Sequence, residues 1–300
     1  MRKFVAAAAA LTLGWSATAQ GAVFYEPFDY PTGNLGLNNL SPTQTWYSSA
    51  TSGTDDRVQV ATGSLSVAGM PASVGNSVTL GGAGRTDRIF LGTNRTTGSV
   101  YYSLMMKVTD LTGTGATGAS VVGFNNTAQT AANHDTAAQP SAISGRLLVK
   151  AIDASTYQVG ASKSSGSAGD FVFTPIGSPY NINTDTVFVV GRYTFNTGSA
   201  TDDTFDLWVN PSSETFADDT LIPAPNVTAT TGADGGQIAT MILRQFTAVI
   251  PAGVQYDELR VDTTWSGVTS NLVPEPASVA TLGLAAAGLL IRRPRRRGHA

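Results

Sequence analysis

The sequence predicts an all-β protein, a sandwich or jelly roll, between two terminal segments of a different kind. Apolar and polar residues alternate with period two along the body, most clearly from Val100 to Val108. Turn-rich segments such as Gly81–Gly84 and Asn196–Gly198 separate about a dozen runs of this type. No amphipathic helical pattern lies between the two ends. Many short strands at such spacing are typical of sandwich and jelly-roll architectures.

The other runs with this alternation are 147–152, 187–195, 205–209, 238–246 and 254–262. β-Branched and aromatic residues dominate the runs, whereas Gly, Ser and Thr dominate the connections, as expected for strands joined by turns. The chain has 300 residues, of which 42% are hydrophobic and only 13% charged. This composition supplies enough apolar material for one large core.

The N-terminus has the three parts of a secretory signal peptide. Met1-Arg2-Lys3 is basic, Phe4–Trp15 is apolar, and small residues follow at Ala17-Thr18-Ala19. We therefore predict a signal helix in residues 1–19, with cleavage after Ala19, or alternatively after Ala22. The competing interpretation is a buried helix of the mature protein.

The C-terminus combines a short apolar helix with an arginine cluster. The apolar segment Ala277–Ile291 has 15 residues, which span roughly 22 Å as a helix, less than a ~30 Å hydrocarbon core. The cluster Arg292–Arg297 should remain cytoplasmic and leave the body outside. We therefore predict a weakly held transmembrane helix, suited to temporary attachment.

Just before this helix, Val273, Pro274, Glu275 and Pro276 form an extended segment, because each proline fixes φ and restricts its preceding residue. Motif, helix and arginine cluster together resemble the PEP-CTERM sorting domain of Gram-negative bacteria. The resemblance implies processing by an exosortase, transient inner-membrane anchoring, and release to the cell surface or extracellular matrix. It also implies exopolysaccharide as a candidate partner.

Three short stretches of the body resemble strands of concanavalin A-like, LamG-type jelly rolls, which often precede PEP-CTERM tails. They are FYEPFDYPTG (Phe24–Gly33), DLWVNP (Asp206–Pro211) and YDELRVDTTW (Tyr256–Trp265). The resemblance implies a lectin-like carbohydrate-binding module, an adhesion module or a glycanase scaffold. The expected organisation is a signal peptide (1–19), a concanavalin A-like jelly-roll β-sandwich (20–265), a linker (266–272) and the sorting tail (273–300).

Charge and composition exclude several classes of function. Seven of the 18 basic residues and one of the 21 acidic residues lie in the terminal segments, which leaves the body with a net charge of -9. Such a body argues against nucleic acid, whose recognition requires cationic surface. The chain has no cysteine, so it has no thiol catalysis, thiolate zinc site or iron–sulfur centre.

The sequence also disfavours catalysis, and we expect no catalytic residues. Glycosidases place two carboxyl groups at defined separations of about 5–9.5 Å, but no Asp or Glu pair is spaced i, i+2 here. Glu258 and Asp262 are roughly 13 Å apart along a strand, with Arg260 between them. Acids from different strands could still meet. His134 is the single body histidine and lies in a polar loop, where solvent exposure is more common than catalysis.

Two acids are candidates for calcium binding. Glu26 has the same strand parity as Phe24 and Phe28. Asp257 has the same parity as Leu259 and Val261. Each carboxylate therefore falls on an apolar face. First and last strands are commonly neighbours in sandwiches that resemble concanavalin A, and two close carboxylates could then share one Ca²⁺. The alternatives are an edge position in water or an arginine partner.

Trp208 is the candidate for stacking on a sugar ring, since it shares the polar parity of its strand with Asp206, although aromatic residues in sandwiches are more often core. The favoured interpretation is an exported surface or matrix protein with a glycan-binding, non-enzymatic sandwich. A glycan-active hydrolase or lyase of the same fold and a purely structural adhesion protein are the alternatives.

Overall fold

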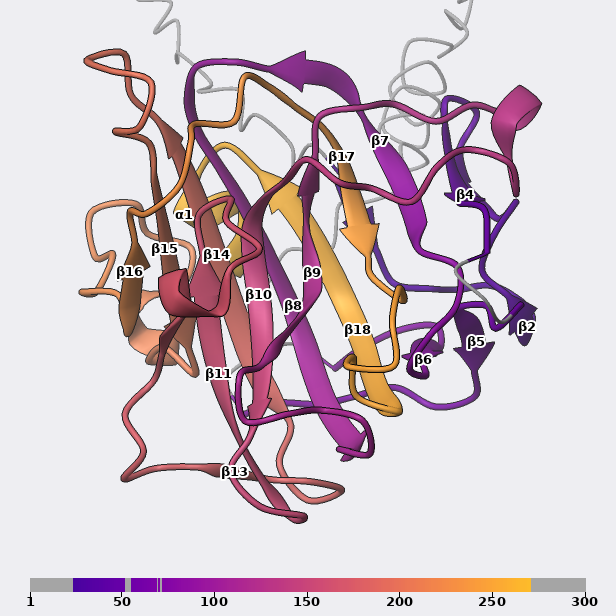
Figure 1. The fold of residues 1–300 in the computed structure, drawn as a ribbon, viewed down its shortest axis with the longest axis horizontal. Coiled ribbons are helices and arrows are strands. Elements are labelled where there is room, and N and C mark those ends of the chain that lie inside the picture. The colour runs from indigo at the N-terminus through magenta and orange to yellow at the C-terminus, as the bar shows by residue number, and fades with distance from the viewer. Residues whose placement is uncertain (1–23, 52–54, 69, 71, 271–300) are drawn as a thin grey trace, which may run out of the picture.

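The computed structural model describes residues 24–51, 55–68, 70 and 72–270. They form an antiparallel sandwich of two sheets with nine strands each (Figure 1). The predicted all-β class is therefore confirmed. The predicted signal helix, transmembrane helix and sorting tail lie outside the described residues. Within the described part of the chain, no helix has the length and apolarity needed to cross a membrane.

The first sheet carries the longest strands at its centre. Its order is β16 (Val227–Ala229), β15 (Thr204–Val209), β14 (Val187–Phe195), β8 (Gly98–Asp110), β18 (Gly253–Asp262), β6 (Ser77–Leu80), β5 (Gln59–Ala61) and β2 (Gly33–Asn34), and β1 (Phe24–Glu26) also pairs with β18. Phe24 lies opposite Val261. The predicted adjacency of the first and last strands is thus confirmed.

The second sheet stacks on the first. Its order is β12 (Val172–Phe173), β11 (Thr156–Ser162), β10 (Ile143–Ala151), β9 (Ala119–Asn125), β17 (Ile238–Leu243), β7 (Asp87–Arg95), β4 (Gln44–Ser48) and β3 (Asn39–Ser41), and β13 (Tyr180–Asn181) also pairs with β11. The helices are η1 (Ala131–Asn133), η2 (Ala168–Asp170), η3 (Ser213–Thr215) and α1 (Trp265–Thr269). The described strands number 18, more than the sequence indicated, because strands of two or three residues are too short to show alternation.

The main core fills the space between the sheets, and a second, smaller core lies on the outer face of the first sheet. The second core contains Phe188, Val190, Trp208, Trp265 and Val268, all buried. Val268 and Thr269 of α1 are fully buried. The sandwich therefore extends through α1, past the predicted boundary at residue 265.

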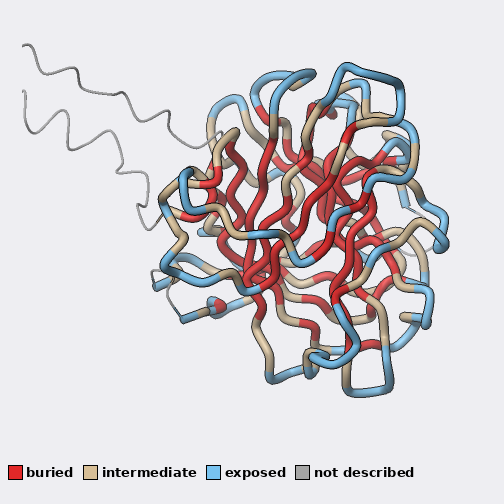
Figure 2. The backbone as a smooth tube through the Cα atoms, turned by 90° about the vertical axis from the view of Figure 1, so that its left-hand side faces the viewer, coloured by how far each residue is buried: buried red, intermediate tan, exposed pale blue. Residues whose placement is uncertain are grey.

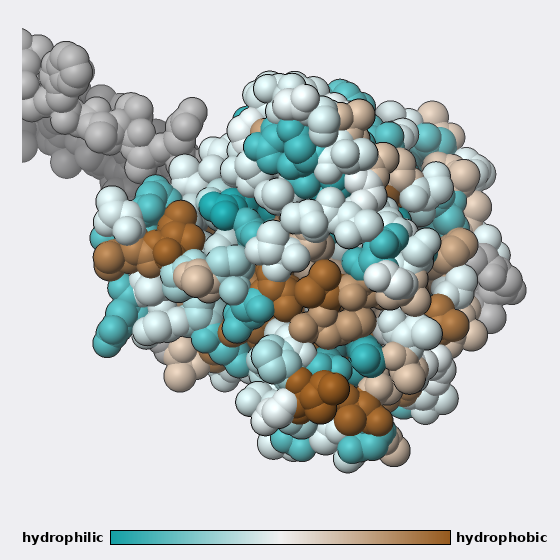
Figure 3. Space-filling model, turned by 60° about the vertical axis from the view of Figure 1, so that its left-hand side comes forward, coloured by the Kyte–Doolittle hydropathy of each residue, from teal (hydrophilic) through white to brown (hydrophobic). Residues whose placement is uncertain are grey.

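Buried residues follow the strands and exposed residues follow the loops (Figure 2). On the face shown in Figure 3, apolar side chains form separate small patches among polar ones. All described strands and both cores lie within residues 24–270, so we expect this segment to fold on its own.

Candidate functional site

The two acids proposed for calcium are both fully buried, and Glu26 lies on the core face, as predicted. Its carboxylate accepts hydrogen bonds from Phe28 N (2.8 Å), Tyr30 Oη (2.7 Å) and Trp46 Nε1 (2.7 Å). Burial raises the pKa of Glu26, and these three bonds oppose the rise. Protein donors therefore provide the partners that this buried carboxylate requires.

Asp257 does not share the face of Leu259, and this part of the prediction is wrong. A β-bulge interrupts β18 between Asp257 and Arg260, with Glu258 at φ 54°. The extra residue reverses the alternation. Asp257 therefore lies opposite Met105 of the second core, whereas Leu259 belongs to the main core.

The Asp257 carboxylate accepts hydrogen bonds from Leu65 N and Glu258 N, both at 2.8 Å, and burial raises its pKa to about 7. Glu26 lies opposite Leu259, in the main core. The two carboxylates thus occupy opposite faces of the first sheet, and the structure does not bring them together for a shared calcium ion.

Trp208 is 1% exposed and cannot stack on a sugar ring in this structure. It packs edge-on against Trp265 at 5.2 Å, and its Nε1 donates to the Pro223 carbonyl at 2.8 Å. Its strand parity was predicted correctly, since it does lie on the outer face. That face is covered by α1 and the segment around η3, which the alternation of β15 alone does not show.

His134 lies in the loop between η1 and β10, and its side chain is only 14% exposed. Its Nδ1 accepts from Ser48 N at 3.0 Å, and its Nε2 lies 3.4 Å from Asp135 Oδ1. Burial lowers the pKa of His134, so the neutral form prevails at neutral pH. Asp135 also pairs bidentately with Arg57, at 2.9 and 2.8 Å. With one nitrogen accepting and the other directed at Asp135, this histidine has no free base for a catalytic triad.

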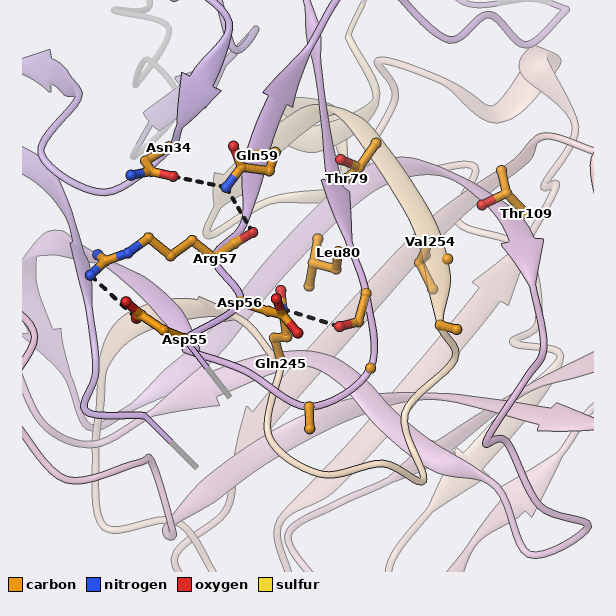
Figure 4. A pocket seen from close by; sticks show the side chains of 15 residues that line it. Asn34, Asp55, Asp56, Arg57, Gln59, Thr79, Leu80, Thr109, Gln245 and Val254 are labelled. Carbon is orange, nitrogen blue, oxygen red and sulfur yellow. Dashed lines mark hydrogen bonds and ion pairs between the residues drawn. The ribbon is translucent and has the colours of Figure 1, made fainter. Parts of the chain in front are cut away.

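A polar pocket of about 810 Å³ lies at one edge of the sandwich (Figure 4). The loop residues Asp55, Asp56 and Arg57 line it together with the ends of β6 and β18. Asp55 pairs with Arg85 and, at 3.4 Å, with Arg57. The charged groups at this pocket are thus largely neutralised by one another.

Three acids from two segments of the chain do meet, as the sequence left open. Asp202, Asp203 and Asp234 hold carboxylate oxygens within 4.8 Å of one another. Lys163, fully buried, donates to Asp234 at 2.8 Å, and Tyr193 Oη donates to Asp203 at 2.7 Å. These contacts tie the loops together at this end of the sandwich.

Charges are segregated between the two sheets. The charged residues in the described strands of the second sheet are Arg88, Arg95, Arg146, Lys150 and a single acid, Asp87. Those of the first sheet are the acids Glu26, Asp110, Asp206, Asp257, Glu258 and Asp262 and the cations Lys107, Arg192 and Arg260. A cationic sheet thus occurs in a body with an overall negative charge.

Three arginines lie on the outer face of the second sheet, and we call this surface the arginine face. Arg88 and Arg146 alternate with core residues of β7 and β10, and Arg244 directly follows β17. Arg88 and Arg146 are 3% and 6% exposed, and Arg244 is half-buried. Half-buried Tyr47 lies beside Arg88 on β4.

None of the ion pairs in the described residues includes Arg88, Arg146 or Arg244. Their hydrogen bonds go to backbone carbonyls: Arg88 to Ala138, Arg146 to Ser164, and Arg244 to Ser120. The acceptors Ala138 and Ser164 belong to the loops 126–142 and 163–171. These loops therefore border the face on two sides.

These arginines are not among the site residues predicted from the sequence. Strand parity contained the signal, because Arg88 precedes core residue Ile89, and Lys150 follows core residue Val149. What parity could not show is that no carboxylate of the described residues would form an ion pair with these three arginines, since that depends on which strands become neighbours.

The C-terminus matches the PEP-CTERM protein-sorting motif over residues 272–297. The motif is therefore present, and it implies exosortase processing and export to the cell surface. Val273, Pro274, Glu275 and Pro276 lie within it and outside the described residues. No curated protein matches the chain in sequence.

Several solved structures are similar to this chain along most of its length. The globular domain of T. cruzi calreticulin is 10% identical with a TM-score of 0.45, over 90% of this chain and 98% of that one. An endo-β-1,4-glucuronan lyase from the fungus Trichoderma reesei is 12% identical with a TM-score of 0.39, over 84% and 100%. The metal-free carbohydrate recognition domain of Emp46p is 8% identical with a TM-score of 0.39, over 78% and 96%.

Proposed function

We propose that this protein is an exosortase-sorted surface or extracellular-matrix protein whose sandwich binds polysaccharide without cleaving it. The sorting motif supports the export and processing. The observation that carries the binding function is the partly exposed pair of Arg244 and Phe246 after β17, where the guanidinium lies 5.0 Å from the ring centroid and both groups reach the surface of the sandwich.

Two features support binding without catalysis. His134 has no free lone pair, and no other histidine lies in the described residues. Of the acids that meet, Asp234 accepts hydrogen bonds from Lys163 and from two backbone amides, and Asp203 accepts from Tyr193 and from Asn196 N. Asp202 Oδ2 accepts from Ser199 N, and its Oδ1 has no partner. A general acid must instead present its proton to the glycosidic oxygen.

The test combines binding and turnover. The segment 20–270 is mixed with a panel of neutral and acidic polysaccharides, and retention is measured by affinity electrophoresis. Product release is followed by reducing ends and by the ultraviolet absorbance of unsaturated sugars. We expect retention by at least one polysaccharide and no product. Product release that a single carboxylate substitution abolishes would favour the hydrolase or lyase alternative, and binding to none would favour the structural adhesion protein.

Processing is tested separately in the native host. Mass spectrometry of surface material should find the protein without residues 1–19 and without Arg292–Arg297. An intact C-terminus on the surface protein would contradict exosortase processing.

A further inference from the structure

A row of polar side chains crosses the outer face of the first sheet, and we call it the polar row. The strand register places Asn34 opposite Gln59, Gln59 opposite Thr79, Thr79 opposite Gln255, and Gln255 opposite Lys107. Figure 4 shows Asn34, Gln59 and Thr79 in line on β2, β5 and β6. Each member of the row has a main-core residue next to it in the chain, so the row itself lies on the outer face. It crosses five adjacent strands.

The polar row has hydrogen-bonding groups that reach solvent. Gln59, Thr79 and Gln255 are all partly exposed. The amide nitrogens of Gln59 and Gln255 donate hydrogen bonds within the protein. Their amide oxygens and the Thr79 hydroxyl form no hydrogen bond with the described residues, and none of these three groups is fully buried. A ligand can therefore contact them without a change in the fold.

The row borders the polar pocket of about 810 Å³ (Figure 4), and this volume is typical of ligand sites. Asn34, Gln59 and Thr79 line the pocket from the strands of the first sheet. Gln245 lines it from the segment that carries the pair of Arg244 and Phe246. The polar row, the pocket and this segment are therefore contiguous.

The length and the charge of this surface indicate the kind of ligand. Five strands about 4.8 Å apart give the row a length of roughly 19 Å, which suits an extended chain better than one small molecule. The charged residues of the row and the pocket are Asp55, Asp56, Arg57 and Lys107. Two acids and two cations leave no net charge, so the surface has no field that would attract a polyanion.

We infer that the polar row and its pocket bind a neutral polysaccharide, whose hydroxyl groups form hydrogen bonds with Gln59, Thr79 and Gln255. This rests on the proposed polysaccharide binding and specifies its ligand class and the surface that the chain follows. A sugar hydroxyl both donates and accepts, so it matches amide oxygens and a threonine hydroxyl. An added peptide strand would instead need free backbone groups, which the paired strands under the row already use.

The experiment measures the affinity of the segment 20–270 for dextran, galactomannan and polygalacturonate by affinity electrophoresis. The variants are Gln59→Ala and Thr79→Val, and the matched control is Thr204→Val. Thr204 of β15 is also a partly exposed threonine on the outer face of the first sheet, because its neighbour Phe205 belongs to the main core. Three strands, β14, β8 and β18, separate it from the strand of Thr79. The melting temperature of each variant is measured as well.

We expect dextran or galactomannan to bind more tightly than polygalacturonate. Gln59→Ala and Thr79→Val should each weaken this binding by roughly fivefold, because each removes one hydrogen bond to the ligand. Thr204→Val should leave the affinity unchanged. A weaker affinity at an unchanged melting temperature separates a contact with the ligand from a structural role.

Tighter binding of polygalacturonate would overturn the neutral ligand and leave the proposed function standing. Binding of a neutral polysaccharide that Gln59→Ala and Thr79→Val do not weaken, or that Thr204→Val weakens equally, would overturn the polar row as its site, again without loss of the proposed function. Binding to no polysaccharide, in this set or in the wider panel, would overturn both proposals.

Discussion

The outer faces of the two sheets differ in how their charges are satisfied. On the first sheet, Arg192 pairs with Asp206 at 2.6 Å and Arg260 pairs with Glu258 at 2.7 Å. Trp208 and Trp265 close part of that face with an apolar layer. On the second sheet, Arg146 and Arg244 donate hydrogen bonds to carbonyl oxygens, and the Arg244 guanidinium also lies 5.0 Å from the centroid of the Phe246 ring.

This difference shows two ways of compensating a buried cation. The first sheet places carboxylates against Arg192 and Arg260. The second sheet places backbone carbonyl oxygens against Arg88, Arg146 and Arg244. The contrast leads to three predictions about stability.

The largest effect should come from the covered face. Trp265→Ala removes a fully buried ring and the hydrogen bond from Nε1 to the Thr215 carbonyl at 2.7 Å. We expect a loss of about 3–5 kcal/mol in the free energy of unfolding, measured by urea denaturation. Phe90→Ala, at a half-buried position on the second sheet, should cost about 1–2 kcal/mol, since less surface is exposed. Equal losses would mean that the second core does not form.

An intermediate effect should come from Asp87, the single acid in the strands of the second sheet. Burial raises its pKa from 3.8 to about 7, and the charge of Arg57 opposes the rise. The folded state therefore holds a proton that the unfolded state has lost. This contribution to stability is full below pH 3.8 and disappears as the pH rises to about 7.

Asp87→Asn should remove a decline on the order of 2–4 kcal/mol between about pH 4 and pH 7. Denaturation curves at several pH values measure it. Asp153→Asn is the control, since Asp153 is exposed and its pKa is lowered to about 2 by hydrogen bonds from Ser155 and Thr156. A pH dependence that is the same in Asp87→Asn and the native sequence would contradict the raised pKa.

The smallest effect compares one arginine from each face. Arg192→Gln breaks an ion pair with Asp206 and should destabilise by about 1 kcal/mol. Arg244→Gln removes a cation without a carboxylate partner and should be neutral or stabilising by up to about 1 kcal/mol. Thermal and chemical denaturation of both variants measure the difference, and a similar loss in both would remove the distinction between the faces.

Strand alternation predicted the all-β fold class, but it placed Asp257 on the wrong face of the first sheet. That error produced the predicted calcium pair. In β18 the alternation holds through Tyr256 and resumes at Leu259, and the bulge at Glu258 shifts Asp257 to the other face. A bulge inserts a residue without changing local composition, so the pattern alone does not reveal it. The predicted calcium pair depended on that one position.

The sequence by itself determined the all-β class, the apolar and the polar side of most strands, and the sorting tail. Each of these depends on residues close together in the chain. Tertiary structure alone decided which outer face is covered and which cations have partners. Trp208 became core because α1, more than fifty residues later, lies on it. Arg244 forms no ion pair because Asp87, the acid on the neighbouring β7, lies on the core side opposite Leu243. Such neighbours are set by the order of strands in the sheets, and no local pattern of residues encodes that order.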